Sequence, residues 1–347
     1  MVYLEVGHIT IDTISLPELK PTQVLVKAHQ ASVCGSERYF YRGITVRPQD
    51  EARGSPDQRS RTGERPKHAY PMGPLGHEGG GTIVEIGSDV DEYLGGGKVK
   101  VGDHVGSLVY PTYTDYWVTD PSHVQPIPEG VPLEVGCLYE PLGCAAWAAL
   151  HMGVKLGDTV AVNGAGFAGN IMLQGALKAG ASKVIVVDVV KNKLDIAKKL
   201  GADFTIDANK GDPIKTVLEL TDGEGVDVAI EAIGGTGIGI VQALGMVKHN
   251  GIMALYGDNY APVKEFCFHR FHEDSLEIRN LNAVHYTKLR GIENMREAYT
   301  AVQRGVFNLD IILENSVRYK LDEISDVFEK EAETLDTQTS LKTLIIP

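Results

Sequence analysis

In the first half of the chain, four side chains of the types that bind zinc lie in short glycine- or proline-containing motifs. Cys34 lies in the segment SVCGSE, His77 and Glu78 lie together in GHEGGG, and Glu140 lies in YEPLG. Zinc takes thiolate, imidazole and carboxylate ligands, and a catalytic site keeps one position open for water or substrate. Each residue alone is typical of ordinary packing or helix capping. Together, ahead of a nucleotide motif, they are poorly explained by chance and are candidates for a catalytic zinc site.

A glycine-rich segment in the middle of the chain has the spacing of a dinucleotide-binding loop. GAGFAG follows the apolar run VAVN and precedes a helix expected to begin near Asn170. Gly164 allows a tight turn, Gly166 lets the backbone approach a pyrophosphate, and Gly169 lets the helix pack closely on the strand. The N-terminus of such a helix offers unpaired N–H groups to phosphate. The motif predicts a dinucleotide cofactor.

An acidic residue follows at the distance typical of ribose recognition. Asp188 ends the apolar run KVIVVD, nineteen positions after Gly169. A carboxylate there binds the adenosine ribose hydroxyls and repels a 2′-phosphate, which favours NAD over NADP. The nearby Lys191 and Lys193 leave NADP open as an alternative.

The elements that must position these residues change in character along the chain. Residues 1–145 contain short β-patterned runs broken by Gly, Pro and Asp, which is typical of an antiparallel, barrel-like domain. Residues 146–286 alternate apolar strands with helices, which indicates a parallel, doubly wound sheet covered on both faces. Residues 287–347 add helices and a closing apolar strand. The predicted fold class is α/β with two domains.

The length, net charge and cysteine content of the chain exclude several classes of binding partner and of fold. The 347 residues are long enough for two domains, and the formal net charge of −13 argues against nucleic acid or an anionic membrane as the main partner. Four scattered cysteines without a C-x-x-C pair exclude a disulfide scaffold and a zinc finger. No signal-peptide pattern and no apolar run of roughly 20 residues is present. We expect a soluble, cytoplasmic protein acting on a small molecule.

The segment 45–70 stands apart from both domains. It is almost free of apolar residues and carries five arginines: Arg47, Arg53, Arg59, Arg61 and Arg65. Such a composition predicts a loop that contributes no core. Its interpretation stays open between a solvated insertion, which the composition favours, a substrate lid and an oligomer contact.

The order of these motifs resembles the zinc-containing medium-chain alcohol dehydrogenases over essentially the full chain. Cys-Gly-Ser, Gly-His-Glu-Gly-Gly-Gly, Val-Gly-Asp-His-Val, Glu-Pro-Leu and Gly-Ala-Gly-Phe-Ala-Gly follow one another as in that family. The Cys-Gly-Ser-acid and Glu-Pro-Leu forms are most similar to the polyol, sorbitol dehydrogenase-like branch. The resemblance implies a GroES-like antiparallel β-barrel catalytic domain (1–145 and 287–347) and an NAD-binding Rossmann domain (146–286).

The resemblance also implies roles for individual residues. The implied ligands of the zinc are Cys34, His77, Glu78 and, directly or through water, Glu140. Ser36 resembles the family's proton-relay hydroxyl, whereas Tyr39 stands where many relatives have a relay histidine. Implied cofactor contacts are Gly164, Gly166, Phe167, Ala168, Gly169, Asp188 and Lys342, with Lys342 folding back onto the pyrophosphate. A solvated lysine is the alternative for Lys342.

The residues expected to contact the substrate are predicted from weaker sequence signals than the zinc and cofactor residues. They are Tyr39, Phe40, Asn282, His285 and Tyr286. Hydroxyl and amide groups suit a polyol, sugar or cyclitol, because a site built to hydrogen-bond rejects substrates that lack the matching groups. We therefore expect reversible oxidation of a secondary hydroxyl to a ketone with NAD.

Two departures from the family pattern matter. No four-cysteine lobe follows the segment 101–105, so no structural zinc is expected. The 43 positions from Cys34 to His77 exceed the usual gap, and the surplus is the segment 45–70. The substrate entrance therefore differs from that of the best-known polyol enzymes.

Several alternatives remain open. Within the family they are an aldose 1-dehydrogenase of the glucose dehydrogenase type and a threonine-type amino-alcohol dehydrogenase. A zinc-free quinone reductase and a non-catalytic homologue are further alternatives, and the intact ligand residues argue against both. A homodimer or homotetramer is expected.

Overall fold

The computed structural model describes residues 1–43, 74–107, 111–235, 237–259, 263, 268–281, 288–333 and 338–347. The side chains of residues 288–295 are not described. The segment 45–70 lies outside the described residues, as do three of the expected substrate contacts, Asn282, His285 and Tyr286.

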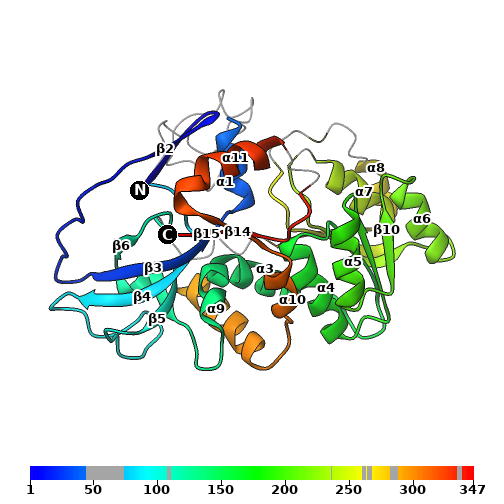
Figure 1. Ribbon diagram of the computed structural model, residues 1–347. Helices are drawn as coiled ribbons and strands as arrows, with labels where there is room; N and C mark the ends of the chain where they lie inside the picture. Colours follow the sequence, from blue (N-terminus) through cyan, green and yellow to red (C-terminus); the bar gives the residue numbers. More distant parts are fainter. Residues whose placement is uncertain are drawn as a thin grey trace.

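A six-stranded parallel sheet forms the centre of one domain (Figure 1). Its strands, in spatial order, are β10 (Phe204–Asp207), β9 (Lys183–Asp188), β8 (Thr159–Asn163), β11 (Val226–Glu231), β12 (Val247–Leu255) and β13 (Glu277–Asn280). The chain starts at β8 in the middle and winds outward in both directions. Ligands of such sheets bind at the carboxyl ends of the strands where the order reverses, here between β8 and β11.

Helices cover both faces of this sheet. Val160 and Val162 pack with α3 (Tyr139–His151), α4 (Phe167–Ala179) and α5 (Lys191–Lys199). Ala161 points to the opposite face, which is covered by α6 (Pro213–Leu220) and α7 (Ile238–Met246). The near-continuous apolar runs of these strands follow from burial on both sides. The predicted doubly wound sheet is confirmed.

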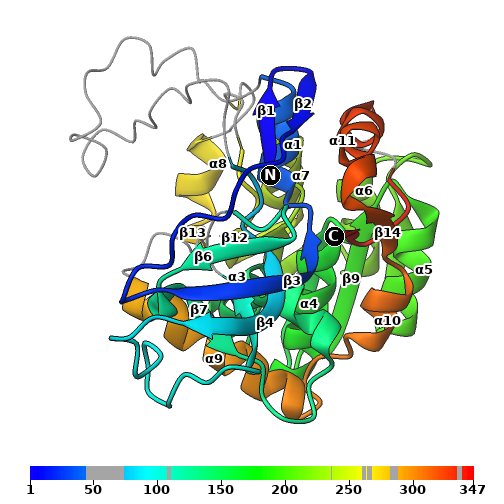
Figure 2. The same cartoon turned by 60° about the vertical axis from the view of Figure 1, so that its left-hand side comes forward.

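A second, mostly antiparallel sheet forms the barrel-like domain (Figure 2). Its strands are, in spatial order, β14 (Val317–Lys320), β15 (Thr343–Ile346), β3 (Val24–Ser32), β4 (Gly79–Ile86), β5 (His104–Ser107) and β7 (Val124–Pro126), with β6 (Tyr116–Thr119) also paired to β3. β14 and β15 bring the C-terminal part of the chain back to the domain that the N-terminal part builds. The predicted barrel-like fold is confirmed, and the exact domain boundaries stay a prediction.

The remaining elements link the two domains or cover the barrel. β1 (Val2–Glu5) and β2 (His8–Ile11) form a hairpin beside α1 (Gly35–Tyr41) and α11 (Ile324–Glu333). α3 contacts both α4 of the nucleotide domain and α9 (Lys288–Gln303). Two further short helices are α8 (Phe268–Glu273) and α10 (Asp310–Glu314).

Glu231 joins two loops at the carboxyl edge of the parallel sheet. Its side chain is fully buried at the end of β11. The carboxylate accepts hydrogen bonds from the backbone N–H groups of Ile233 (2.9 Å), Gly234 (2.7 Å) and Gly257 (3.1 Å) and from Asn259 Nδ2 (3.2 Å). The loops that follow β11 and β12 are therefore held together by one anionic group.

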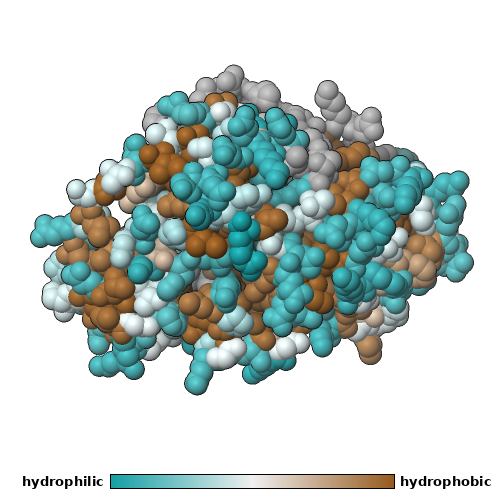
Figure 3. All heavy atoms as spheres, viewed as in Figure 1, coloured by the Kyte–Doolittle hydropathy of each residue, from teal (hydrophilic) through white to brown (hydrophobic). Residues whose placement is uncertain are grey.

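Hydrophobic and hydrophilic side chains are interspersed on the face shown in Figure 3. Within the described part of the chain, no helix combines the length and apolar character needed to cross a membrane.

Candidate active site

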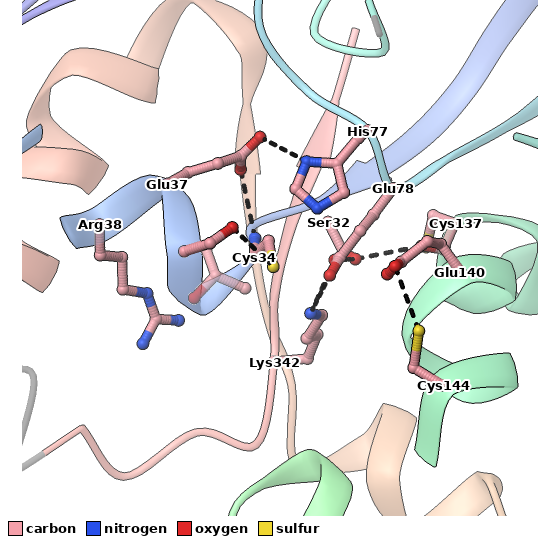
Figure 4. A network of polar contacts seen from close by, with 12 residues as sticks. Ser32, Cys34, Glu37, Arg38, His77, Glu78, Cys137, Glu140, Cys144 and Lys342 are labelled. Carbon is pink, nitrogen blue, oxygen red and sulfur yellow. Dashed lines mark hydrogen bonds and ion pairs between the residues drawn. The ribbon is translucent and has the colours of Figure 1, made fainter. Parts of the chain in front are cut away.

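Three of the predicted zinc ligands lie together (Figure 4). One ligand atom each from Cys34, His77 and Glu78 falls within 4.8 Å of the other two. Cys34 precedes the first turn of α1, and the other two residues immediately precede β4. Glu140, in the first turn of α3, lies outside this group, but Figure 4 shows its carboxyl group beside that of Glu78.

The strand pairing explains how distant segments meet here. β3 and β4 are antiparallel with Ala31 opposite Gly79, and Ser32 N–H donates to the Glu78 carbonyl at 2.9 Å. At Gly80 a Cβ atom would lie 2.8 Å from the backbone of Gly136. Glycine therefore lets the turn that leads into α3 approach β4, which brings Glu140 to the other ligands.

A buried carboxylate orients His77. Glu37 is fully buried on α1, and its Oε1 lies 3.1 Å from His77 Nδ1. Its Oε2 accepts hydrogen bonds from Tyr113 Oη at 2.5 Å and from Cys34 N–H at 3.2 Å. Because a carboxylate only accepts, Nδ1 carries the proton and Nε2 is left for a metal. This role of Glu37 was not predicted, although the acid of the Cys-Gly-Ser-Glu segment was a signal for it.

The charges of this pocket favour a cation. Burial lowers the pKa of His77, but the neighbouring Cys34 and Glu37 outweigh burial and hold that pKa well above its ordinary value. Burial also raises the pKa of Glu37, yet His77 and the hydrogen bonds from Tyr113 and Cys34 bring it below the ordinary value. A negative potential with one thiol, one imidazole and one carboxylate around it suits a zinc ion.

Glu78 has two partners besides the ligand cluster. It is 1% exposed, and Lys342 Nζ lies 2.9 Å from its Oε1 and 2.7 Å from its Oε2. Ser32 Oγ donates to Oε2. Lys342 is itself 7% exposed, so the alternative of a solvated lysine is wrong. Its predicted contact with a pyrophosphate stays a prediction.

Glu140 does not cap its helix. The residue before α3 is Leu138, and no side chain caps that end of the helix. Instead Glu140 Oε1 accepts a hydrogen bond from Cys144 Sγ at 3.3 Å. Burial raises the pKa of Glu140, although His77 pulls it down. The capping alternative is therefore wrong, and whether Glu140 binds zinc stays a prediction.

The nucleotide loop matches its predicted geometry in three glycines and differs in one detail. Gly164 has φ +110°, and a Cβ on Gly169 would lie 1.9 Å from the Gly164 carbonyl oxygen. A Cβ on Gly166 would meet no atom within 4 Å, which leaves its backbone open to a ligand. Helix α4 begins at Phe167 rather than near Asn170, because Gly166 is already the extended residue that precedes the helix.

The remaining predicted cofactor residues lie around this loop. Asp188 Oδ2 accepts from Ala165 N–H at 2.7 Å, so its carboxylate sits directly beside the glycine loop. Phe167 and Ala168 open helix α4. Lys191 Nζ forms an ion pair with Asp195 Oδ2 at 2.6 Å, on the exposed side of α5.

The residues after Cys34 on α1 divide between the site and the core. Ser36 Oγ donates to Cys34 Sγ at 3.3 Å. Tyr39 Oη lies against the backbone of Gly235, where a Cβ would be 2.4 Å away, so it spans from α1 to the loop after β11. Phe40 is 7% exposed and packs in a hydrophobic cluster with residues such as Phe328. The expected substrate contact of Phe40 is therefore not supported, because the core takes up its ring.

Comparison with known proteins agrees with this architecture. The family model of the alcohol dehydrogenase GroES-like domain matches residues 20–146, and that of the zinc-binding dehydrogenase matches residues 168–300. The L-threonine 3-dehydrogenase of Bacillus licheniformis is 25% identical over 360 aligned residues, covering 97% of this chain and 95% of that protein. The sorbitol dehydrogenase of Mus musculus is 29% identical over 240 residues, 66% of each chain.

A solved structure shares the whole fold. An NADP-bound protein of Sinorhizobium meliloti 1021, described as a zinc-binding dehydrogenase, superposes with a TM-score of 0.79 at 23% identity. The match covers 100% of this chain and 98% of that one. With both family models matched on the two domains and the ligand cluster in place, the chain belongs to the zinc-containing medium-chain alcohol dehydrogenases.

Proposed function

We propose that the protein is a zinc-dependent, NAD-linked dehydrogenase that reversibly oxidises a secondary hydroxyl of a polyol, sugar or cyclitol to a ketone. One observation carries the proposal. Cys34, His77 and Glu78 converge within 4.8 Å beside a parallel sheet whose first loop has dinucleotide-binding geometry.

The chemistry of the donor set fits zinc, which we expect at one ion per chain. Cys34 Sγ, His77 Nε2 and the Glu78 carboxylate would hold it. We propose Glu140, on which the charges of His77 and Glu78 act, as a further ligand, directly or through water. When bound, zinc supplies a Lewis acid that polarises the oxygen of an alcohol or a ketone. The described residues contain three cysteines, which are too few for the four-cysteine cluster of a structural zinc site.

The chain itself supplies proton transfer and orientation. Ser36 Oγ lies 3.3 Å from Cys34 Sγ, so it can accept the proton of a hydroxyl group placed beside that ligand. Tyr39, three positions along the same helix, lies on the same face as Ser36 and reaches the nucleotide domain. The nicotinamide accepts the hydride, and this chemistry belongs to the cofactor.

Asp188 supports NAD as the preferred cofactor. Its carboxylate lies beside the glycine loop at the end of β9, the position from which an acid binds ribose hydroxyls and repels a 2′-phosphate. The NADP bound to the Sinorhizobium meliloti protein keeps NADP as the alternative to be measured.

The substrate class rests on the site motifs and on the relatives. The Cys-Gly-Ser-Glu and Glu-Pro-Leu segments and the similarity to sorbitol dehydrogenase support a polyol. A threonine-type amino-alcohol dehydrogenase is the second candidate, because L-threonine 3-dehydrogenase matches along 97% of this chain.

A substrate screen tests the proposal. Reduction of NAD and NADP would be followed with polyols, cyclitols, sugars and L-threonine, and zinc would be measured by mass spectrometry on the same sample. We expect NAD reduction with a polyhydroxylated substrate and one zinc per chain. Turnover of L-threonine alone would establish the second candidate, and activity without metal would overturn the zinc assignment. Light scattering would test the expected homodimer or homotetramer.

A further inference from the structure

Lys342 lies between the metal ligands and the nucleotide loop. Its Nζ forms an ion pair with both oxygens of Glu78, at 2.9 Å and 2.7 Å. The same Nζ lies 5.5 Å from the centre of the Phe167 ring, the first residue of α4. One buried ammonium group thus faces a metal ligand on one side and the start of the phosphate-binding helix on the other.

The ion pair restricts Glu78 as a ligand. With Lys342 on both oxygens and Ser32 Oγ on Oε2, the carboxylate has its charge already balanced. A buried carboxylate that loses its cationic partner is strongly destabilised, and a divalent cation is the replacement that removes the penalty. Metal and Lys342 therefore compete for the same carboxylate.

Lys342 and Arg38 differ in how their charges are held. Arg38, the other cation nearby, is fixed by buried Glu331, with Nε and Oε2 2.6 Å apart. Glu331 is held in turn by Thr343 and Gln338. A lysine side chain, by contrast, is a point charge on a flexible four-carbon stem, so the head of Lys342 can change partners while the backbone just before β15 stays in place.

We propose that Lys342 couples the binding of the dinucleotide to the binding of the metal. The phosphates of the cofactor, bound at Gly164 and Gly166, draw Lys342 away from Glu78, and the freed carboxylate then binds zinc more tightly. By linkage, zinc on Glu78 frees Lys342 for phosphate and strengthens cofactor binding by the same factor. The inference rests on the proposed zinc and dinucleotide sites and not on the identity of the substrate.

The coupling is measured as the zinc affinity of the wild-type protein with and without ADP-ribose, by competition with a chelator. ADP-ribose carries the pyrophosphate and cannot react, so catalysis does not interfere. We expect ADP-ribose to tighten zinc binding by about 5- to 150-fold, the usual range of coupling between two sites. Adenosine, which lacks phosphate, should leave the zinc affinity unchanged. Equal zinc affinities with and without ADP-ribose would overturn the proposal.

The variant Lys342→Met tests whether the ammonium group of Lys342 carries the coupling. The variant should bind zinc at least as tightly as the ADP-ribose-bound wild type, and ADP-ribose should no longer change that affinity. Coupling that survives in Lys342→Met, or zinc binding weakened in it, would show a merely structural ion pair. Asn192→Ala is the matched control, because it removes another contact of the C-terminal segment with the nucleotide domain, Asn192 Nδ2 to the Thr339 carbonyl at 2.9 Å, and should keep the coupling.

Two outcomes separate this inference from the proposed function. Failure of the protein to bind zinc, or to bind ADP-ribose, at any concentration would contradict the proposed function itself. Binding of both without mutual influence would contradict only the coupling. If Lys342→Met does not fold, the comparison of ADP-ribose with adenosine in the wild type still decides the question.

Discussion

The nucleotide loop and the proposed metal site would bind their ligands by different means. The loop is one contiguous segment, and it offers backbone groups exposed by Gly164 and Gly166. The proposed metal site gathers side chains from α1 and α3 and from the residues just before α1, β4 and β15, and its buried charges depend on one another. Substitutions at this site should therefore affect several partners at once, whereas those around the loop should act one at a time.

The largest expected effect is that of Cys34→Ala. Removing the thiolate should abolish zinc binding and turnover. NAD should still bind, because Cys34 and the glycine loop belong to different domains, and its affinity should fall by no more than the coupling factor of about 5- to 150-fold that is lost with the zinc. Zinc content by mass spectrometry and NAD binding by calorimetry would check both halves. Two zinc ions per wild-type chain would contradict the expected absence of a structural zinc.

Glu37→Gln should have the next largest effect. The amide keeps the size of the side chain but removes the negative charge that fixes the tautomer of His77, so zinc affinity and kcat should fall by about 10- to 100-fold. Tyr113→Phe, which removes only one hydrogen bond to Glu37, should lower zinc affinity less. Equal zinc affinities of Glu37→Gln and the wild type would mean that His77 is oriented by other groups.

Asp188→Ser should change cofactor preference without touching the metal. Loss of the carboxylate removes both a ribose ligand and the repulsion of a 2′-phosphate. The ratio of kcat/KM for NAD to that for NADP should fall by about tenfold or more, equivalent to roughly 1.4 kcal/mol. Zinc content should be unchanged. A wild type that already prefers NADP would show that the role assigned to Asp188 is wrong.

The smallest expected effect concerns a partly exposed ion pair of the nucleotide domain. Partial burial raises the pKa of Asp227, but Lys248 at 2.5 Å and the N–H of Thr159 outweigh it and bring that pKa below its ordinary value. Its contribution is therefore present above about pH 4 and is lost as the pH falls through the lowered pKa. Asp227→Asn should lower the free energy of unfolding by at most about 1 kcal/mol at pH 7, measured in urea.

The stability difference between Asp227→Asn and the wild type should shrink toward pH 3. A loss of several kcal/mol at pH 7 would mean that this pair behaves like the buried pair of Glu78 and Lys342.

The same contrast explains what the sequence could predict. The glycine loop, Asp188 and the parallel sheet follow from local patterns, since strand, turn and helix are adjacent in the chain. The ligands Cys34, His77 and Glu78 were predicted from their chemical types together with the resemblance. The partners of these ligands were not, because Glu37 meets His77 and Lys342 meets Glu78 only through long-range pairing of strands. Phe40 shows the opposite error, since adjacency to a ligand does not say which face of a helix is buried.

The hydrogen bonds of Glu231 affect how tightly a cofactor would bind. Its carboxylate accepts hydrogen bonds from Gly234 after β11 and from Gly257 after β12, and so fixes the backbone at these positions when the chain folds. Conformational entropy of the loops is therefore lost on folding and not on association, which leaves more of the contact energy available as affinity. The backbone that Tyr39 contacts at Gly235 is thus preorganised. Conformational change on cofactor binding is then left to side chains that can change partners.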